Sequence, residues 1–152
     1  MEKLHGFAPI FDGNSRVLIL GSFPSVKSRQ TEFYYGNKQN RFWKMLSQAF
    51  GESEPLTVED KIHLCLNHNI ALWDIVASCR ITGSMDADIK DCELVDLQQV
   101  LSKSKIEKIL CNGATAYKLT TSVCYGLPVY KLPSTSPANV RFDKAVWFEY
   151  LR

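Results

Sequence analysis

The 152 residues suffice for one domain with a buried core, and the 45% hydrophobic and 22% charged content excludes a disordered chain. The five cysteines are odd in number, widely spaced and without a CxxC pair, which argues against a disulfide framework and against a zinc or iron–sulfur site. The net charge of +2 says little about partners, and no apolar run is long enough for a signal peptide or a membrane-spanning helix. We therefore expect a single cytoplasmic domain over residues 1–152 with reduced cysteines in its core.

Four short runs of β-forming residues alternate with helical patterns along the chain. The expected strands are Arg16–Leu20, Ile70–Val76, Ile106–Cys111 and Leu127–Leu132. The expected helices are Arg41–Phe50, Val58–Asn67, Asp91–Leu101, Gly113–Thr121 and Asp143–Leu151. Asn40 and Thr57 are good N-cap residues for the first two of these helices. The alternation predicts right-handed crossovers and an α/β fold in which helices cover both faces of a small parallel sheet.

Three segments that follow expected strands should meet at one edge of this sheet. They are GSFPS at 21–25, CNGATAY at 111–117 and LPSTSPAN at 132–139. The carboxyl ends of parallel strands share an edge, and the active sites of open α/β sheets lie there. We therefore expect the functional site to be built from these segments.

The segment 33–43, FYYGNKQNRFW, contains five aromatic residues, two asparagines and a glycine. Flat rings lining a pocket suit a flat ligand, and a nucleobase is the obvious candidate. Five basic residues and one acid lie between Lys27 and Lys44, whereas the segment 86–96 is acidic. This local positive charge favours binding of a polyanion such as DNA. The alternative with the same composition is a solvated loop whose basic side chains bind nothing.

The segment 132–139 carries three hydroxyl groups between two prolines, on Ser134, Thr135 and Ser136. Hydroxyl and backbone N–H groups on a stiff turn can bind phosphate oxygens. The alternative is a proline-braced connection in which the serines cap their own backbone.

Together, GSFPSVKS, YYGNKQNRFWKML, IALWDIVASCRITGSMDADI and LPSTSPAN resemble the uracil-DNA glycosylase superfamily, and within it the hypoxanthine-DNA (DNA-deoxyinosine) glycosylase branch. The resemblance spans Val17–Asn139. It implies a single-domain α/β/α sandwich with a central four-stranded parallel sheet. It also implies a monofunctional enzyme of base excision repair, which flips a deaminated base out of DNA and hydrolyses its N-glycosidic bond without metal or organic cofactor. DNA containing such a base is the expected partner, and we expect a monomer.

The site residues that the resemblance implies depart from the common pattern. Most members carry Asp or Asn after the first strand, where this chain has Ser22 and Phe23, and Leu132 stands where many have His or Asn. In the deoxyinosine branch an Asn of the aromatic segment is implicated instead, which here is Asn40 or, second, Asn37. The residues expected to bind the base are Gly21, Ser22, Phe23, Pro24, Tyr35 and Gly36.

An asparagine amide fits this chemistry because the departing base becomes anion-like and a well-placed donor stabilises it by about 2–4 kcal/mol. A carboxamide also matches the O6 acceptor and N1–H donor of hypoxanthine. Uracil presents the same edge and adenine would suit a flipped amide, so an amide alone does not set the specificity.

Each candidate has a simpler interpretation. Asn40 can act only as a helix cap, Asn37 as a turn residue and Tyr35 as packing. Asp74 is more simply a structural residue at a strand end than a base, and Phe42 and Trp43 are expected in the core. The alternative functions are a uracil or mismatch-uracil glycosylase, a non-catalytic module that binds damaged or single-stranded DNA, and a small enzyme acting on a free nucleotide.

Overall fold

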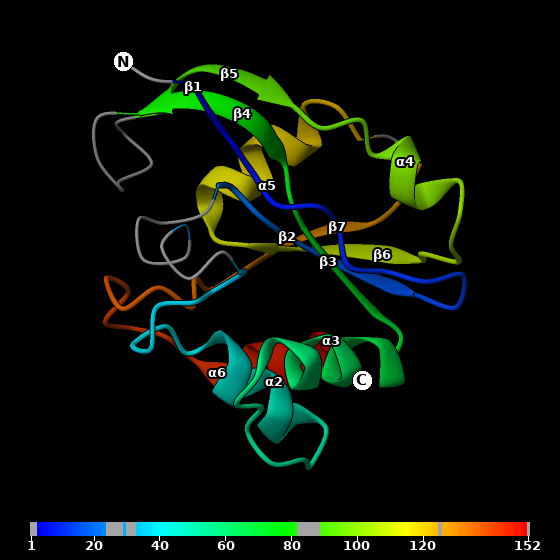
Figure 1. The fold of residues 1–152 in the computed structure, drawn as a ribbon, viewed down its shortest axis with the longest axis vertical. Helices are drawn as coiled ribbons and strands as arrows, with labels where there is room; N and C mark the ends of the chain where they lie inside the picture. The colour runs from blue at the N-terminus through cyan, green and yellow to red at the C-terminus, as the bar shows by residue number, and fades with distance from the viewer. Residues whose placement is uncertain (1–2, 24–28, 30–32, 82–88, 125, 152) are drawn as a thin grey trace.

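A four-stranded parallel sheet forms the centre of the computed structural model, which describes residues 3–23, 29, 33–81, 89–124 and 126–151 (Figure 1). Its strands are β2 (Val17–Gly21), β3 (Ile70–Asp74), β6 (Lys108–Asn112) and β7 (Val129–Leu132), in the order β3-β2-β6-β7. Every neighbouring pair is parallel. The expected four-stranded parallel sheet is therefore confirmed.

The two strands β2 and β3 run through the core. Leu18, Ile19 and Leu20 are completely buried, and every residue of β3 is buried. A strand covered on both faces needs a continuous apolar run, because both of its side-chain rows lie against helices or a second layer. The runs VLIL and IALW meet this requirement, which is why their pattern alone marked them as strands.

Helices cover both faces of the sheet. On one face lie α2 (Phe42–Ala49), α3 (Val58–Asn67) and α6 (Lys144–Leu151), and on the other lies α5 (Ala114–Thr121), with the short α4 (Gln98–Leu101) at one side (Figure 1). Phe42 and Trp147 are fully buried between α2 and α6, and Trp43 is 4% exposed, so the core assignment of Phe42 and Trp43 is confirmed. Within the described ranges, no helix is long and apolar enough to cross a membrane.

Of the two predicted N-caps, Thr57 is confirmed and Asn40 is not. The Thr57 side chain accepts a hydrogen bond from the Asp60 N–H at 3.0 Å and caps α3 as predicted. Helix α2 begins at Phe42 with Arg41 at its N-cap position, so the prediction that Asn40 caps a helix starting at Arg41 is wrong by one residue. The Asn40 Oδ1 atom nevertheless accepts a hydrogen bond from the Phe42 N–H at 2.9 Å. This is an Asx turn, in which the side chain binds the backbone N–H two residues later.

A second, three-stranded antiparallel sheet was not predicted. It consists of β1 (Lys3–His5), β4 (Val76–Ile81) and β5 (Ile89–Leu94) in the order β1-β4-β5. The predicted helix over Asp91–Leu101 is therefore wrong: its first part is strand, and only Gln98–Leu101 is helical. Pairing with β4 satisfies the backbone of β5, and such tertiary pairing overrides the weak local preference for a helix.

Candidate active site

Three strand ends stand side by side at the carboxyl edge of the parallel sheet. Gly21 ends β2 and is in register with Asp74 at the end of β3, while Asn112 ends the other neighbour, β6. The loop that precedes α2 and the loop that follows β7 lie next to each other at this edge (Figure 1). The segments that the sequence singled out are thus brought together.

Gly21 is the point of closest approach. A Cβ atom built on it would lie 2.4 Å from Asp74 Oδ1 and 3.0 Å from the Tyr35 hydroxyl oxygen. Real Cβ atoms do not tolerate such distances, so no side chain fits here without moving the carboxylate. Glycine at this position lets a carboxylate and a phenol converge over the end of β2.

Tyr35 is held in an unusual conformation above this point. Its backbone φ is 51°, in the left-handed region that non-glycine residues seldom adopt. The ring stacks on Phe42 with centroids 4.1 Å apart and planes 24° apart, and the residue is half-buried. Burial, and then the charge of Asp74, raise the pKa of the Tyr35 hydroxyl, so the phenol is neutral at physiological pH. The Asn112 amide approaches the buried hydroxyl without the geometry of a hydrogen bond.

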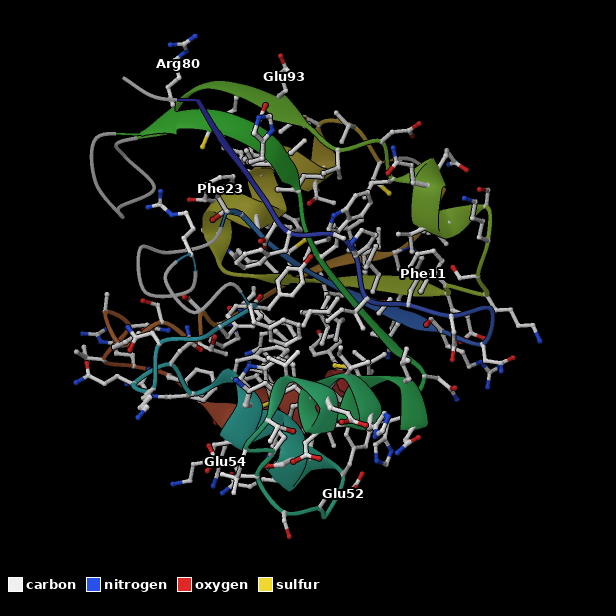
Figure 2. The ribbon with its side chains drawn as sticks, viewed as in Figure 1. Phe11, Phe23, Glu52, Glu54, Arg80 and Glu93 are labelled. Atoms are coloured by element: carbon white, nitrogen blue, oxygen red, sulfur yellow. The ribbon has the colours of Figure 1, made fainter. Side chains whose placement is uncertain are left out.

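The turn after β2 faces partly away from this cluster. The Ser22 carbonyl accepts from the Val76 N–H at 3.0 Å, which ties the turn to β4. Figure 2 shows Phe23 close to the three-stranded sheet, and its Cε1 atom would lie 3.8 Å from a Cβ on Gly6. Pro24, the remaining candidate of this turn, lies outside the described residues.

Both candidate asparagines have a fixed amide orientation. Asn40 Oδ1 accepts from the Phe42 N–H at 2.9 Å, and Asn37 Oδ1 accepts from the Gln39 N–H at 3.0 Å. The Asn40 N–H also donates to the Asn37 carbonyl at 2.9 Å, so the two residues share one turn. Because the backbone holds each oxygen, the Nδ2 group is the end of each side chain that can donate to a ligand.

Arg41 joins the aromatic segment to the 132–139 loop. Its backbone N–H donates to the Thr135 carbonyl at 3.1 Å, and its Nη1 donates to the carbonyls of Ser136 at 3.0 Å and Asn139 at 2.9 Å. The guanidinium carbon lies 5.3 Å from the centroid of the Phe142 ring. These contacts fix the loop beside Asn40.

Asn112 anchors the same loop from the end of β6. Its Nδ2 donates to Thr135 Oγ1 and its Oδ1 accepts from the Thr135 N–H, both at 3.0 Å, and Thr135 is completely buried. Ser134 Oγ accepts from the Ser136 N–H and Ser136 Oγ accepts from the Ala138 N–H, both at 3.2 Å. Both serines thus cap the loop's own backbone, and both are half-buried.

Sequence reasoning missed the roles of Arg41 and Asn112. Arg41 was counted only as one basic residue among five, although it stands inside the NRFW motif. A signal existed for Asn112, because a polar residue that ends a buried apolar run and precedes a glycine commonly marks a strand end facing a site. For Arg41 no local signal existed, because its carbonyl partners lie about a hundred residues away in the chain.

The described residues contain no group of three or more His, Cys, Asp or Glu side chains arranged to hold a metal ion. The site consists instead of aromatic rings, amides, hydroxyl groups and one buried carboxylate. Such a set can stack on a planar ligand and form hydrogen bonds to its edge.

Comparison with known proteins agrees with this arrangement. The family model of the uracil DNA glycosylase superfamily matches residues 8–151. A hypoxanthine DNA glycosylase of Methanosarcina acetivorans is 35% identical over 144 residues, which cover 91% of this chain and 90% of the relative. A protein of the same name from Methanosarcina barkeri is 34% identical over 146 residues, with 94% and 92% coverage.

A solved structure gives the same result for the fold. The solution NMR structure of a candidate uracil DNA glycosylase from Methanosarcina acetivorans superimposes with a TM-score of 0.86 at 33% identity, covering 99% of this chain and 98% of that protein. Fold, motifs and relatives agree over nearly the whole length. The chain therefore belongs to the uracil DNA glycosylase superfamily.

Proposed function

We propose that this protein is a monofunctional DNA glycosylase of base excision repair, which flips a deaminated base out of DNA, hypoxanthine by preference, and hydrolyses its N-glycosidic bond. Two relatives that share about a third of its residues are named hypoxanthine DNA glycosylase. The structural observation that carries the proposal is the fixed amide of Asn40 at the carboxyl edge of the sheet, beside an aromatic platform.

Breaking a nucleoside C–N bond leaves positive charge on the sugar and negative charge on the base. A donor that already points at the base stabilises this charge without having to reorient during the reaction. The Phe42 N–H holds the oxygen of the Asn40 amide, so its Nδ2 group is presented as the donor. Asn37 has the same type of turn and remains the second candidate.

Tyr35 suits the role of platform for the flipped base. Phe42 covers one face of its ring, and the residue keeps partial exposure. The hydroxyl end of the ring lies beside Gly21, so a base stacked on the remaining face would lie near the point where the strand ends converge. Gly36, also half-buried, follows directly and leaves room for the base.

The 132–139 loop would hold the DNA backbone around the flipped nucleotide. Each hydroxyl of Ser134 and Ser136 accepts one backbone hydrogen bond and retains its proton for a phosphate oxygen. Thr135 is buried against Asn112, so its part is to shape the loop. Val140, 88% exposed just after the loop, is an apolar side chain of the kind that enters a gap between bases.

We further propose that the protein acts as a monomer in the cytoplasm, without a metal or organic cofactor. Its five cysteines are free thiols, as expected in a reducing compartment. Each copy carries the complete set of candidate residues, so no second subunit is needed for the site. Sedimentation with and without DNA would test the monomer.

The test is a panel of oligonucleotides, each with one hypoxanthine, uracil, xanthine or abasic site, incubated with excess chelator and then cleaved with alkali. We expect strand breaks at hypoxanthine. Breaks mainly at uracil would assign a uracil glycosylase, and tight binding without breaks would assign a binding module. Activity that requires an added divalent ion would contradict the proposed chemistry.

The role of Asn40 is tested with Asn40→Ala and Asn40→Asp. Alanine removes the donor, and we expect single-turnover base release to fall by about two orders of magnitude. Aspartate keeps an oxygen for the Phe42 N–H but places negative charge against a departing anion, so this variant should be stable and slow. The matched control is the same pair of changes at Asn37. A fast Asn40→Asp variant together with an inactive Asn37→Ala variant would transfer the role to Asn37.

A further inference from the structure

Two of the five cysteines lie opposite each other on neighbouring strands of the three-stranded sheet. Cys79 belongs to β4 and Cys92 to β5, and these strands pair antiparallel. The paired residues on either side of Cys79 are Ser78 with Glu93 and Arg80 with Lys90. Between these pairs β4 has one residue and β5 has two, which is a β-bulge. Cys79 therefore faces Cys92 and the residue before it.

The two thiols also share one face of this sheet. Ser78 Oγ lies 3.5 Å from Glu93 Oε2, so these two side chains lie on the same face. Figure 2 shows Arg80 and Glu93 pointing away from the rest of the molecule. Successive side chains of a strand alternate between faces, so Cys79 and Cys92 share the opposite face. The Cys79 thiol accordingly lies within hydrogen-bonding reach of the Cys92 thiol.

This arrangement suits a disulfide bond. Directly opposed residues of antiparallel strands have Cα atoms about 4.5–5.5 Å apart. A disulfide joins residues whose Cα atoms are about 4.4–6.8 Å apart. The pairing of β4 with β5 thus already holds the two cysteines at a separation that the bond can span.

The two thiols differ in their access to solvent. Cys92 is exposed, whereas Cys79 is completely buried. Burial, and then the neighbouring Cys92, raise the pKa of the Cys79 thiol to about 11, so this thiol is protonated at neutral pH. A soluble oxidant therefore reaches Cys92 first, and Cys79 is the adjacent thiol that reacts with the oxidised product.

We propose that Cys79 and Cys92 form a reversible disulfide bond when the protein meets hydrogen peroxide. The peroxide O–O bond breaks, one oxygen joins the Cys92 sulfur to give a sulfenic acid, and the other oxygen leaves as water. The Cys79 sulfur then attacks the Cys92 sulfur and its S–O bond breaks. The departing hydroxyl takes the thiol proton of Cys79 as a second water. The two thiols lose two electrons, which the peroxide gains, and a dithiol reductant restores them by thiol–disulfide exchange.

The bond would strengthen the more weakly held of the two sheets. Strand β5 lies at the edge of its sheet and pairs there with β4 alone, in a register that shifts at two points. Closing the loop 79–92 restricts the unfolded chain, so the oxidised protein should be the more stable form. The bond also protects Cys92 from further oxidation to sulfinic acid, which thiol reductants do not reverse. This proposal stands or falls independently of base release.

The experiment treats the whole protein with hydrogen peroxide and counts its thiols after denaturation. We expect two of the five thiols to disappear and to return when dithiothreitol is added. Trypsin cleaves after Arg80 and Lys90, so Cys79 and Cys92 fall in separate peptides that only the disulfide keeps joined. The melting temperature should rise by about 5–10 °C on oxidation and fall back on reduction.

Two variants sharpen the assignment. Cys92→Ser changes an exposed side chain and leaves the core intact, and it should show neither the joined peptides nor the rise in melting temperature. Cys124→Ser is the matched control, because Cys124 is the other cysteine that is not fully buried, and it should respond to peroxide as the wild type does.

Several results would overturn the proposal. Cys111 and Cys124 also lie near each other, and peptides joined at these two residues instead would assign the bond elsewhere. Disulfide-linked dimers through Cys92 would contradict an intramolecular bond. A Cys92 that proceeds to sulfinic acid while Cys79 remains a thiol would do so as well, as would equal thiol loss in Cys92→Ser and the wild type.

Discussion

Replacing Arg41 with alanine tests whether one side chain holds the two halves of the site together. The guanidinium donates to two loop carbonyls, at 3.0 Å and 2.9 Å, and lies over the Phe142 ring. Hydrogen bonds from a charged donor contribute about 1.5–3 kcal/mol each, and a partly exposed cation–π contact about 0.5–1 kcal/mol. These terms are not additive and Arg41 is only half-buried, so we expect Arg41→Ala to lower the free energy of unfolding by about 2–4 kcal/mol.

For a chain of this length each kcal/mol shifts the melting temperature by about 2–4 °C, so the Arg41→Ala variant should melt roughly 4–16 °C below the wild type. Its affinity for lesion and normal DNA should fall together, because the phosphate-binding loop loses its shape. Arg141→Ala removes the same charge from the same region, at an exposed side chain, and serves as the control. Its melting temperature should stay within about 2 °C.

Thermal unfolding followed by circular dichroism, and DNA binding measured over a series of salt concentrations, distinguish the two effects. Loss of a phosphate contact lowers the salt dependence of binding, whereas loss of loop shape lowers affinity and stability together. If Arg41→Ala melts and binds DNA like Arg141→Ala, the contacts of the Arg41 guanidinium with the loop contribute nothing and the reasoning is refuted.

Three further predictions concern the same edge of the sheet. Replacing both Ser134 and Ser136 with alanine should weaken binding to lesion and normal DNA alike, as electrophoretic shift would show, while melting curves show that the fold survives. Normal binding and full-rate cleavage would mean that the loop only connects its neighbouring elements. Gly21→Ala should lower base release more than tenfold and stability by about 1–3 kcal/mol, since the new Cβ displaces the Asp74 carboxylate; a wild-type rate would contradict this geometry. Burial raises the pKa of Tyr34, so its contribution to stability is complete below about pH 10. Above that pH the phenol ionises first in the unfolded chain, and the free energy of unfolding falls by about 1.4 kcal/mol per pH unit. Tyr34→Phe should reduce that slope in denaturant titrations.

The sequence predicted the central sheet because β2, β3 and the middle of β6 are buried and carry continuous apolar runs. The apolar runs of β2 and β3 admit few other structures, and helices between strands require crossovers. The second sheet was missed because β1 has three residues and β5, IKDCEL, is mixed in polarity. Its pairing with β4 comes from tertiary contacts that no local propensity encodes.

The site was predicted in its segments but not in its connections. The aromatic segment and the 132–139 loop were identified, and the structure places them together. Arg41, which connects them, was missed because its carbonyl partners lie about a hundred residues away in the chain, and Asn112, which anchors the loop to β6, was missed although its place at a strand end was a signal. The orientation of the Asn40 amide likewise depends on a helix that begins one residue later than predicted, at Phe42, whose N–H donates to the amide oxygen.

The way in which the 132–139 loop is held has an evolutionary consequence. Arg41 binds carbonyl oxygens, which every amino acid supplies, at positions 135, 136 and 139. Mutation at 136 therefore leaves its carbonyl acceptor in place, while it changes the hydroxyl group that we propose for phosphate binding. Selection can vary that side chain while Arg41 still holds the backbone, which makes this position one where new substrate preferences arise without a loss of fold.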